Sequence, residues 1–221
     1  WRRRRHRVDE DAESGRREMT PLKDPAHLAF PGCGLALDRP RVMGILNVTP
    51  DSFYDGGRFD SPDRAVARAE KMVAEGADII DVGGESSRPA GPYGKGAQTV
   101  STEEEISRTA PLIARIVRLL DVPISIDTTK TAVARAAVEA GATIVNDISG
   151  VTQTPDTTRL LAEAKCGVVL MHMKGTPQSM QDNPTYDDVV SEVSSELGKA
   201  AVRCRDSGVD AGRIVVDPGF G

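Results

Sequence analysis

Short apolar segments alternate with amphipathic segments along most of the chain. The apolar segments are almost continuous runs of Val, Ile and Leu, a pattern typical of strands that are covered on both faces. The segments between them have apolar residues at helical spacing. We expect strands at residues 42–46, 78–82, 122–126, 142–145, 167–171 and 213–216. This order of strand and helix predicts an α/β protein with a parallel sheet.

The helices are expected at residues 61–75, 102–120, 130–140, 157–164 and 186–207. Ser61 is a favourable cap for the first of them, and Pro62 suits the first helical position. Thr102 and Glu105 have the spacing of a capping box at the start of the second helix. Pro111 lies inside that helix and should bend it.

Two architectures share this pattern, an open doubly wound sheet and a (β/α)8 barrel. The phosphate loops of the open sheets are missing, because Gly96 follows Lys95 where a P-loop has Ser or Thr, and residues 32–34 lack a third glycine in the right place. Side chains at the ends of successive strands meet at one mouth of a barrel. Polar residues stand in such places here: Asn47, Asp81, Asp127, Asn146, Asp147, His172 and Asp217. We therefore predict a TIM (β/α)8 barrel, of which this chain supplies only about six βα units.

Composition narrows the classes of protein that the chain can represent. It has 221 residues, of which 39% are hydrophobic, and a net charge of −5, which fits a globular protein without a nucleic-acid partner. No apolar run approaches the ~20 residues that span a bilayer, so no membrane association is expected. The 3 cysteines are far apart, which excludes a disulfide scaffold and favours a cytoplasmic location.

The beginning of the chain differs from the remainder. Residues 1–18 hold a run of arginines followed by mixed charges, with no apolar period. Such a segment is typical of disorder. We expect a disordered charged extension over residues 1–18 and an incomplete barrel over residues 19–221.

Two polar segments follow the first two strands. Asn47 offers a neutral amide oxygen, which suits Mg²⁺ if substrate phosphates and water complete its coordination. Arg88 offers a planar fork for a phosphate or a carboxylate, and Ser87 adds a hydroxyl. A plain turn with a solvated arginine is the alternative for residues 81–89. Residues 91–101 extend this segment and have the composition of a lid.

The polar ends of three later strands point to a second type of ligand group. Asp127, Asn146 and Asp217 could each be only a cap for the following helix. Together at one barrel mouth they predict a ligand rich in N–H donors, because a carboxylate accepts two parallel N–H bonds and an amide both donates and accepts. Met171 is expected to pack against a flat ring. His172 is one of only 3 histidines, so a histidine-based metal cluster is not expected.

Six short motifs carry these residues in one order along the chain. They include Asn-Val-Thr-Pro-Asp-Ser-Phe, Asp-Val-Gly-Gly-Glu-Ser-Ser-Arg-Pro and Met-His-Met, and they lie at residues 46–53, 81–89, 125–130, 146–150, 171–173 and 217–221. In this order the motifs resemble those of dihydropteroate synthase, the folate-pathway enzyme that sulfonamides block. The resemblance covers about residues 30–221.

The resemblance implies a transferase with a TIM barrel. Such an enzyme joins p-aminobenzoate to 6-hydroxymethyl-7,8-dihydropterin diphosphate in the presence of Mg²⁺ and yields 7,8-dihydropteroate and diphosphate. By motif, Asp127, Asn146 and Asp217 would hold the pterin edge. A full-length member of the family is expected to form a homodimer.

The resemblance also implies where the charges of the reaction are met. Asn47 would contact Mg²⁺ and the diphosphate, and Ser87 with Arg88 would contact the diphosphate. Ser87 stands where the family usually has Thr, a change that keeps the hydroxyl. The diphosphate leaves first, and the carbocation at the pterin methylene is then attacked by the aniline nitrogen. Asp55 is our candidate for a loop carboxylate that stabilises this cation.

The family continues beyond the motif at residues 217–221 with two more βα units. These units bring a lysine, an Arg/His pair for the anion and most of the dimer contact. We therefore expect the 221-residue chain by itself to fold poorly, to be almost inactive and not to dimerise. The alternatives are a pterin-binding barrel of the methyltetrahydrofolate methyltransferase kind, a non-catalytic barrel fragment and, third, a phosphosugar-metabolising barrel. Demand for Mg²⁺ and diphosphate would separate the first alternative from a synthase.

Overall fold

The fold was analysed in a computed structural model of the chain. The structure describes residues 27–48, 61–85, 90–91, 94–95, 100–150, 155–175, 179–180 and 183–220. The extension expected over residues 1–18 lies outside these ranges, and so does the start of the domain expected over residues 19–221.

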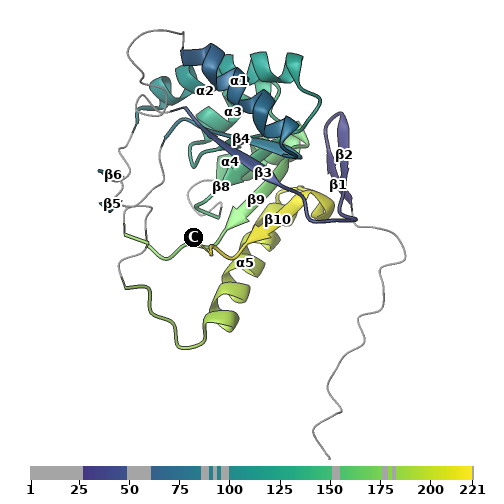
Figure 1. Ribbon diagram of the computed structural model, residues 1–221. Coiled ribbons are helices and arrows are strands. Elements are labelled where there is room, and N and C mark those ends of the chain that lie inside the picture. Colours follow the sequence, from purple (N-terminus) through teal and green to yellow (C-terminus); the bar gives the residue numbers. More distant parts are fainter. Residues whose placement is uncertain are drawn as a thin grey trace, which may run out of the picture.

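A six-stranded parallel sheet forms the centre of the molecule (Figure 1). Its strands lie side by side in the order in which the chain makes them, which is the arrangement of a (β/α)8 barrel; a doubly wound sheet reverses its strand order. The strands are β3 (Met43–Asn47), β4 (Ile79–Gly83), β7 (Ile124–Asp127), β8 (Ile144–Asp147), β9 (Gly167–Met171) and β10 (Ile214–Asp217). The predicted α/β architecture with six strands is confirmed, and β3 and β10 are the outer strands of this sheet.

Helices connect the strands and cover one face of the sheet (Figure 1). They are α1 (Ser61–Ala74), α2 (Thr102–Leu119), α3 (Thr131–Glu139), α4 (Pro155–Ala164) and α5 (Val189–Asp206), with a short 3₁₀ turn, η2 (Ala211–Arg213), before β10. All five expected helices are present. Within the described ranges, none of the helices is both long and apolar enough to cross a membrane.

The predicted capping box at Thr102 is wrong by one residue. The cap is Ser101, whose extended backbone lets its hydroxyl accept a hydrogen bond from the backbone N–H of Glu104 across 3.1 Å. Thr102 is already the first residue of α2. Glu105, the other half of the predicted box, is buried and pairs with Lys130 instead.

Alternate residues of each strand face the helices. Ile124 and Ile126 of β7 belong to the main core together with Ile113 and Ile116 of α2 and Val133 of α3. Ser125 and Asp127 must then face the opposite side of the sheet, because neighbouring strand residues point to opposite faces. Ser125 and Asp127 therefore lie on the inner face of the sheet, which the helices do not cover.

A hairpin at the start of the described chain covers the inner face near the amino-terminal ends of the strands. It consists of β1 (His27–Phe30) and β2 (Cys33–Ala36), which pair antiparallel, and no strand was predicted in this part of the chain. Phe30 packs with Ile79 and Ile144 in a second, smaller apolar cluster. Gly167 makes room for it, since a β-carbon there would lie 2.3 Å from the Phe30 ring.

Candidate functional site

Three polar residues and a glycine stand in one row across four neighbouring strands. The strand register pairs Asn47 of β3 with Gly83 of β4, Gly83 with Asp127 of β7, and Asp127 with Asn146 of β8. All four lie at the carboxyl ends of parallel strands, on the inner face of the sheet. The expected convergence of Asn47, Asp127 and Asn146 is thus present in the fold.

Gly83 keeps the space between two of these side chains open. A β-carbon at this position would lie 3.0 Å from Asn47 Oδ1 and 3.7 Å from Asp127 Oδ2. The amide oxygen and the carboxylate therefore converge over a residue without a side chain. This arrangement leaves oxygen ligands facing a space that a ligand group can enter.

A buried carboxylate lies one layer below this row. Asp81 of β4 is 2% exposed and accepts a hydrogen bond of 3.1 Å from Asn146 Nδ2. Among the described residues, no hydrogen-bond partner is found for Asp81 Oδ1 or for the nearby Ser125 Oγ. Burial raises the pKa of Asp81, and the proximity of Ser125 and the bond from Asn146 oppose that rise. The place of Asp81 near a strand end was predictable from the sequence, whereas its contact with Asn146 was not.

Asp127 has the most perturbed carboxyl group of the row. Burial, followed by the charge of Asp81 and smaller contributions from Glu105, Asp147 and Glu85, raises the pKa of Asp127 to about 8. The side chain still keeps some contact with solvent. A carboxyl group held in this way is ready to ionise when a ligand brings N–H donors to it.

Met171 and Asp217 extend the site onto the last two strands. They are paired in the register of β9 and β10, so they lie side by side at the carboxyl ends. The backbone oxygen of Asp217 accepts from the His172 N–H across 2.8 Å, and its Oδ1 accepts from the Gly219 N–H, also across 2.8 Å. One carboxylate oxygen of Asp217 therefore shapes the turn, and the other is the one that could receive a ligand.

His172 points away from this row. Its Nε2 lies 2.9 Å from Glu196 Oε2 of α5, and its ring lies against Tyr186 with 5.9 Å between the centroids. The contact with Glu196 has ion-pair distance but not hydrogen-bond geometry. His172, which directly follows β9, thus packs between the sheet and α5.

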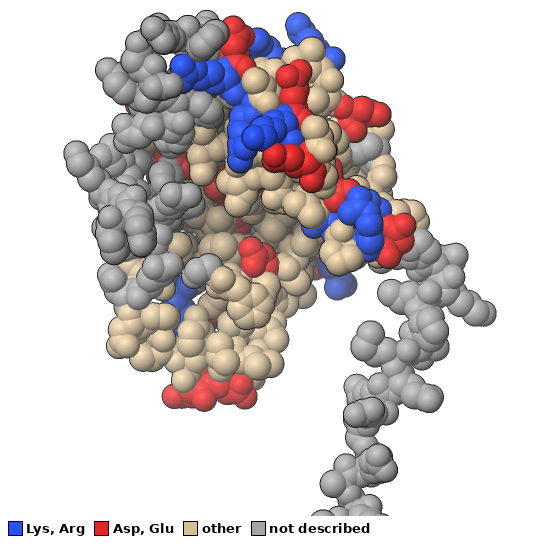
Figure 2. All heavy atoms as spheres, viewed as in Figure 1, with Lys and Arg blue, Asp and Glu red and all other residues tan. Residues whose placement is uncertain are grey.

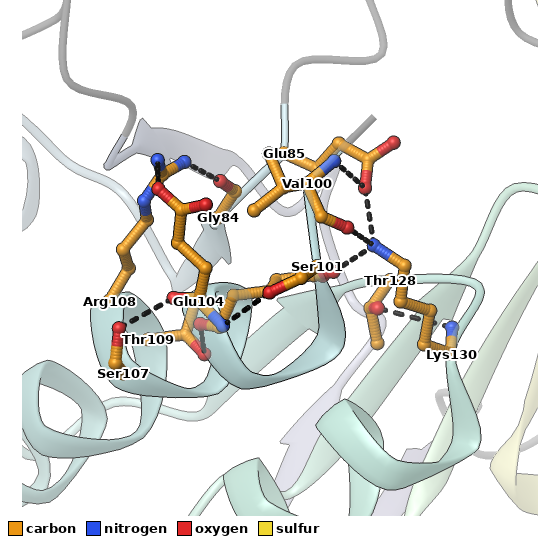
Figure 3. A network of polar contacts seen from close by, with 11 residues as sticks. Gly84, Glu85, Val100, Ser101, Glu104, Ser107, Arg108, Thr109, Thr128 and Lys130 are labelled. Atoms are coloured by element: carbon orange, nitrogen blue, oxygen red, sulfur yellow. Dashed lines mark hydrogen bonds and ion pairs between the residues drawn. The ribbon is translucent and has the colours of Figure 1, made fainter. Parts of the chain in front are cut away.

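The remaining predicted site residues, Asp55, Ser87 and Arg88, lie outside the described residues. The structure does describe the two ends of the connection that contains Ser87 and Arg88. There Lys130, which was not predicted as a site residue, bonds Glu85 (Figure 3). It also bonds Glu105. Its position three residues after Asp127 is the signal that could have drawn attention to it.

No group of three or more His, Cys, Asp or Glu side chains that could hold a metal ion occurs in the described part of the chain. Figure 2 shows charges of both signs over the helices at the top of the view and a mostly tan surface with a small acidic patch near its centre. Among the described residues on this face, the basic groups do not form a continuous surface of the kind that binds nucleic acid.

The fold defines a barrel-type α/β protein, and the polar row is its candidate ligand site at the carboxyl ends of the strands. Residues 43–221 match the sequence model of a family described as pterin binding enzyme. The chain belongs to this family of pterin-binding enzymes.

Dihydropteroate synthases are among the curated relatives of the chain. The chain is 48% identical to that of Synechocystis sp. over 183 residues, which are 83% of this chain and 61% of the relative. It is 46% identical to the Escherichia coli enzyme over 190 residues, 86% of this chain and 65% of the relative. The chain thus spans less than two thirds of the length of these curated relatives.

Solved structures of dihydropteroate synthases are also similar to the chain. The Xanthomonas albilineans dihydropteroate synthase with 4-aminobenzoic acid superposes with a TM-score of 0.79 at 45% identity, covering 89% of this chain and 67% of that one. The Burkholderia cenocepacia enzyme in complex with 7,8-dihydropteroate gives a TM-score of 0.75 at 46% identity, covering 89% and 64%.

Proposed function

We propose that the protein is a dihydropteroate synthase, which condenses 6-hydroxymethyl-7,8-dihydropterin diphosphate with p-aminobenzoate to give 7,8-dihydropteroate and diphosphate. The observation that carries the proposal is the row formed by Asn47, Asp127 and Asn146 across neighbouring strands. The relatives at 43–48% identity are consistent with it. Sulfonamide binding is proposed as well, since a Yersinia pestis relative was solved with a sulfonamide drug.

The pterin edge would be held by three side chains. The ionised carboxylate of Asp127 accepts two parallel N–H bonds from the aminopyrimidine edge, and Asp217 accepts a further one. Asn146 uses its amide nitrogen to bond Asp81, so its amide oxygen is the atom that accepts from the ligand. Met171, beside Asp217, packs against the flat ring.

The reaction breaks the bond between the pterin methylene carbon and the diphosphate oxygen. Arg88 and Ser87 bind the departing diphosphate, and Asp55 stabilises the methylene cation that remains. The lone pair of the aniline nitrogen then forms the new C–N bond, and the nitrogen loses a proton. Arg88 also orients the diphosphate before the bond breaks, because its planar fork fits phosphate oxygens.

Mg²⁺ fits the oxygen-rich side of the row. Asn47 Oδ1 stands over Gly83, and a hard cation prefers such oxygen ligands together with phosphates and water. Asn47 would hold the ion, which when bound neutralises charge on the diphosphate.

A cytoplasmic location is proposed from the thiols. Cys166 and Cys204 are buried and free, and burial raises the pKa of each to about 11, which makes both unreactive. Free thiols are usual in a reducing compartment. We propose a homodimer for the complete protein on the strength of the resemblance alone.

The experiment uses the complete protein that the gene encodes. Diphosphate release is assayed with and without p-aminobenzoate, and pterin binding is measured for Asp127→Asn and Asp217→Asn. Each variant is expected to weaken binding by roughly 1.5–3 kcal/mol, the worth of a charge-assisted hydrogen bond. Unchanged pterin affinity in both variants would refute the assignment of the pocket. Turnover that needs neither Mg²⁺ nor diphosphate would instead favour a methyltransferase-type barrel.

A further inference from the structure

Lys130 uses all three of its N–H donors on partners from other parts of the chain. Its Nζ lies 2.5 Å from Glu85 Oε2, 2.6 Å from Glu105 Oε2 and 2.8 Å from the backbone oxygen of Val100. Figure 3 shows the side chain reaching from the start of α3 towards Glu85 and Val100. An ammonium group has no fourth donor, so its hydrogen-bonding capacity is fully used.

The place of Lys130 in the chain is unfavourable for a lysine. It is the N-cap of α3 and gives that helix no side-chain cap. N-cap positions prefer Ser, Thr, Asp or Asn, and a cation is disfavoured there by the helix dipole. Local structure therefore does not explain why a lysine stands at this position. The three contacts of Lys130 with distant parts of the chain do explain it.

These contacts join two consecutive βα units of the barrel, β4–α2 and β7–α3. Glu85 follows β4, Val100 precedes α2 by two residues, and Glu105 lies in the first turns of α2. Gly84 packs so closely on α2 that a β-carbon there would lie 2.7 Å from Thr109 Cγ2. Lys130 thus ties the end of β4 and the start of α2 to the turn that follows Asp127.

The network also holds negative charge close to the site. Glu105 is 1% exposed, so its carboxylate depends on Lys130 for compensation. The groups that raise the pKa of Asp127 are Asp81, Glu105, Asp147 and Glu85, after burial itself. Two of these four carboxylates are the ones that Lys130 contacts.

We propose that Lys130 is a positioning residue of the pterin site, whose ammonium fixes the ends of the β4–α2 connection and compensates Glu85 and Glu105 so that Asp127 can ionise and bind the ligand. The proposal rests on the proposed function in so far as it assigns Asp127 to the pterin. Its electrostatic part concerns Asp127 alone and can be measured without any ligand.

The test compares Lys130→Met, Lys130→Arg and the double variant Lys130→Met/Glu105→Gln in the complete protein. Lys130→Met leaves the carboxylates of Glu85 and Glu105 without a compensating cation. The double variant restores the net charge that Lys130, Glu85 and Glu105 have together in the wild type, and Lys130→Arg keeps that net charge. The matched control is Lys199→Met, which removes an exposed lysine from α5. The pKa of Asp127 is followed by NMR of ¹³C-labelled Asp carboxyl groups, and affinity for 6-hydroxymethylpterin is measured from pH 5 to 9.

We expect the midpoints of the Asp127 titration and of the binding profile to rise by roughly half a pH unit or more in Lys130→Met. Both midpoints should return towards wild type in Lys130→Arg and in the double variant. Wild-type midpoints in Lys130→Met would overturn the proposal, and so would a double variant whose midpoints stay as high as those of Lys130→Met. If wild type binds no pterin, the proposed function fails, while the Asp127 titration still decides the role of Lys130.

Discussion

The amide nitrogen of Asn146 donates a hydrogen bond of 3.1 Å to the carboxylate of Asp81, a residue 65 positions earlier in the chain. The two residues belong to β8 and β4, and β7 with Asp127 lies between these strands. The bond therefore passes across the inner face of the sheet, beneath the row of ligand-facing residues. It fixes the amide of Asn146 and places a buried carboxylate next to Asp127.

The first prediction concerns this buried carboxylate. Asp81→Asn removes the charge that, after burial, contributes most to the raised pKa of Asp127. The variant should lower the pKa of Asp127, and the pH at which pterin affinity reaches half its maximum should fall with it. Binding titrations from pH 5 to 9 measure this shift. A binding profile that moves to higher pH would contradict the electrostatic account.

The second prediction concerns stability as a function of pH. The pKa of Asp127 rises from 3.8 to about 8 on folding, so between these values the folded protein binds a proton that the unfolded chain has released. The stabilising contribution is complete below pH ~4 and is lost as the pH rises to about 8. Asp127→Asn should remove this loss and make the protein more stable than wild type at pH 8, by on the order of 1–3 kcal/mol.

Urea unfolding at pH 5 and pH 8 checks this expectation. Asp121→Asn serves as the control, because it removes the carboxylate of an exposed residue. Equal stability of Asp127→Asn and wild type at pH 8 would mean that Asp127 ionises without cost in the folded state.

The third prediction separates two neighbouring glycines. In Gly83→Ala the new β-carbon would lie 3.0 Å from Asn47 Oδ1, so the Asn47 side chain must move and binding of Mg²⁺ with the pterin diphosphate should weaken. In Gly84→Ala it would lie 2.7 Å from Thr109 Cγ2 and 2.9 Å from Glu105 Cγ, so the end of β4 and α2 must separate. We expect Gly84→Ala to lose about 1–3 kcal/mol of stability.

Calorimetric binding and urea unfolding of both variants distinguish the two effects. Gly198→Ala is the control, because a β-carbon there meets nothing within 4 Å and the residue lies inside α5. That change should stabilise the protein by roughly 0.5–1 kcal/mol. Loss of stability in Gly83→Ala as large as in Gly84→Ala would argue against a ligand space over Gly83.

The fourth prediction concerns Arg88. Arg88→Ala should reduce kcat/KM for the pterin diphosphate strongly, and it should leave the affinity for a pterin without diphosphate almost unchanged. Arg115→Ala, which removes an exposed partner of Asp63 on the helices, provides the control for loss of a surface guanidinium. If Arg88→Ala weakens both ligands to the same degree, Arg88 does not act on the diphosphate.

Much of the fold followed from local patterns in the sequence. The strand predicted at residues 167–171 coincides with β9, and the other five predicted strands differ from the observed ones by one or two residues at each end. Continuous apolar runs between helical segments leave few alternatives to a parallel sheet. Because all strands of such a sheet end at the same edge, the meeting of Asn47, Asp127 and Asn146 was predictable as well.

Contacts between distant residues were decided only by the tertiary structure. Phe30 packs against Gly167 and so holds the hairpin β1–β2 in place. Asp81 is buried beneath Asn146, which donates a hydrogen bond to it. The side chain of His172 is directed towards Glu196 of α5. Lys130 meets Glu105 and Glu85 from 25 and 45 positions away. A local pattern states which face of an element is apolar, but a side chain finds its partner only when register and packing bring two elements together.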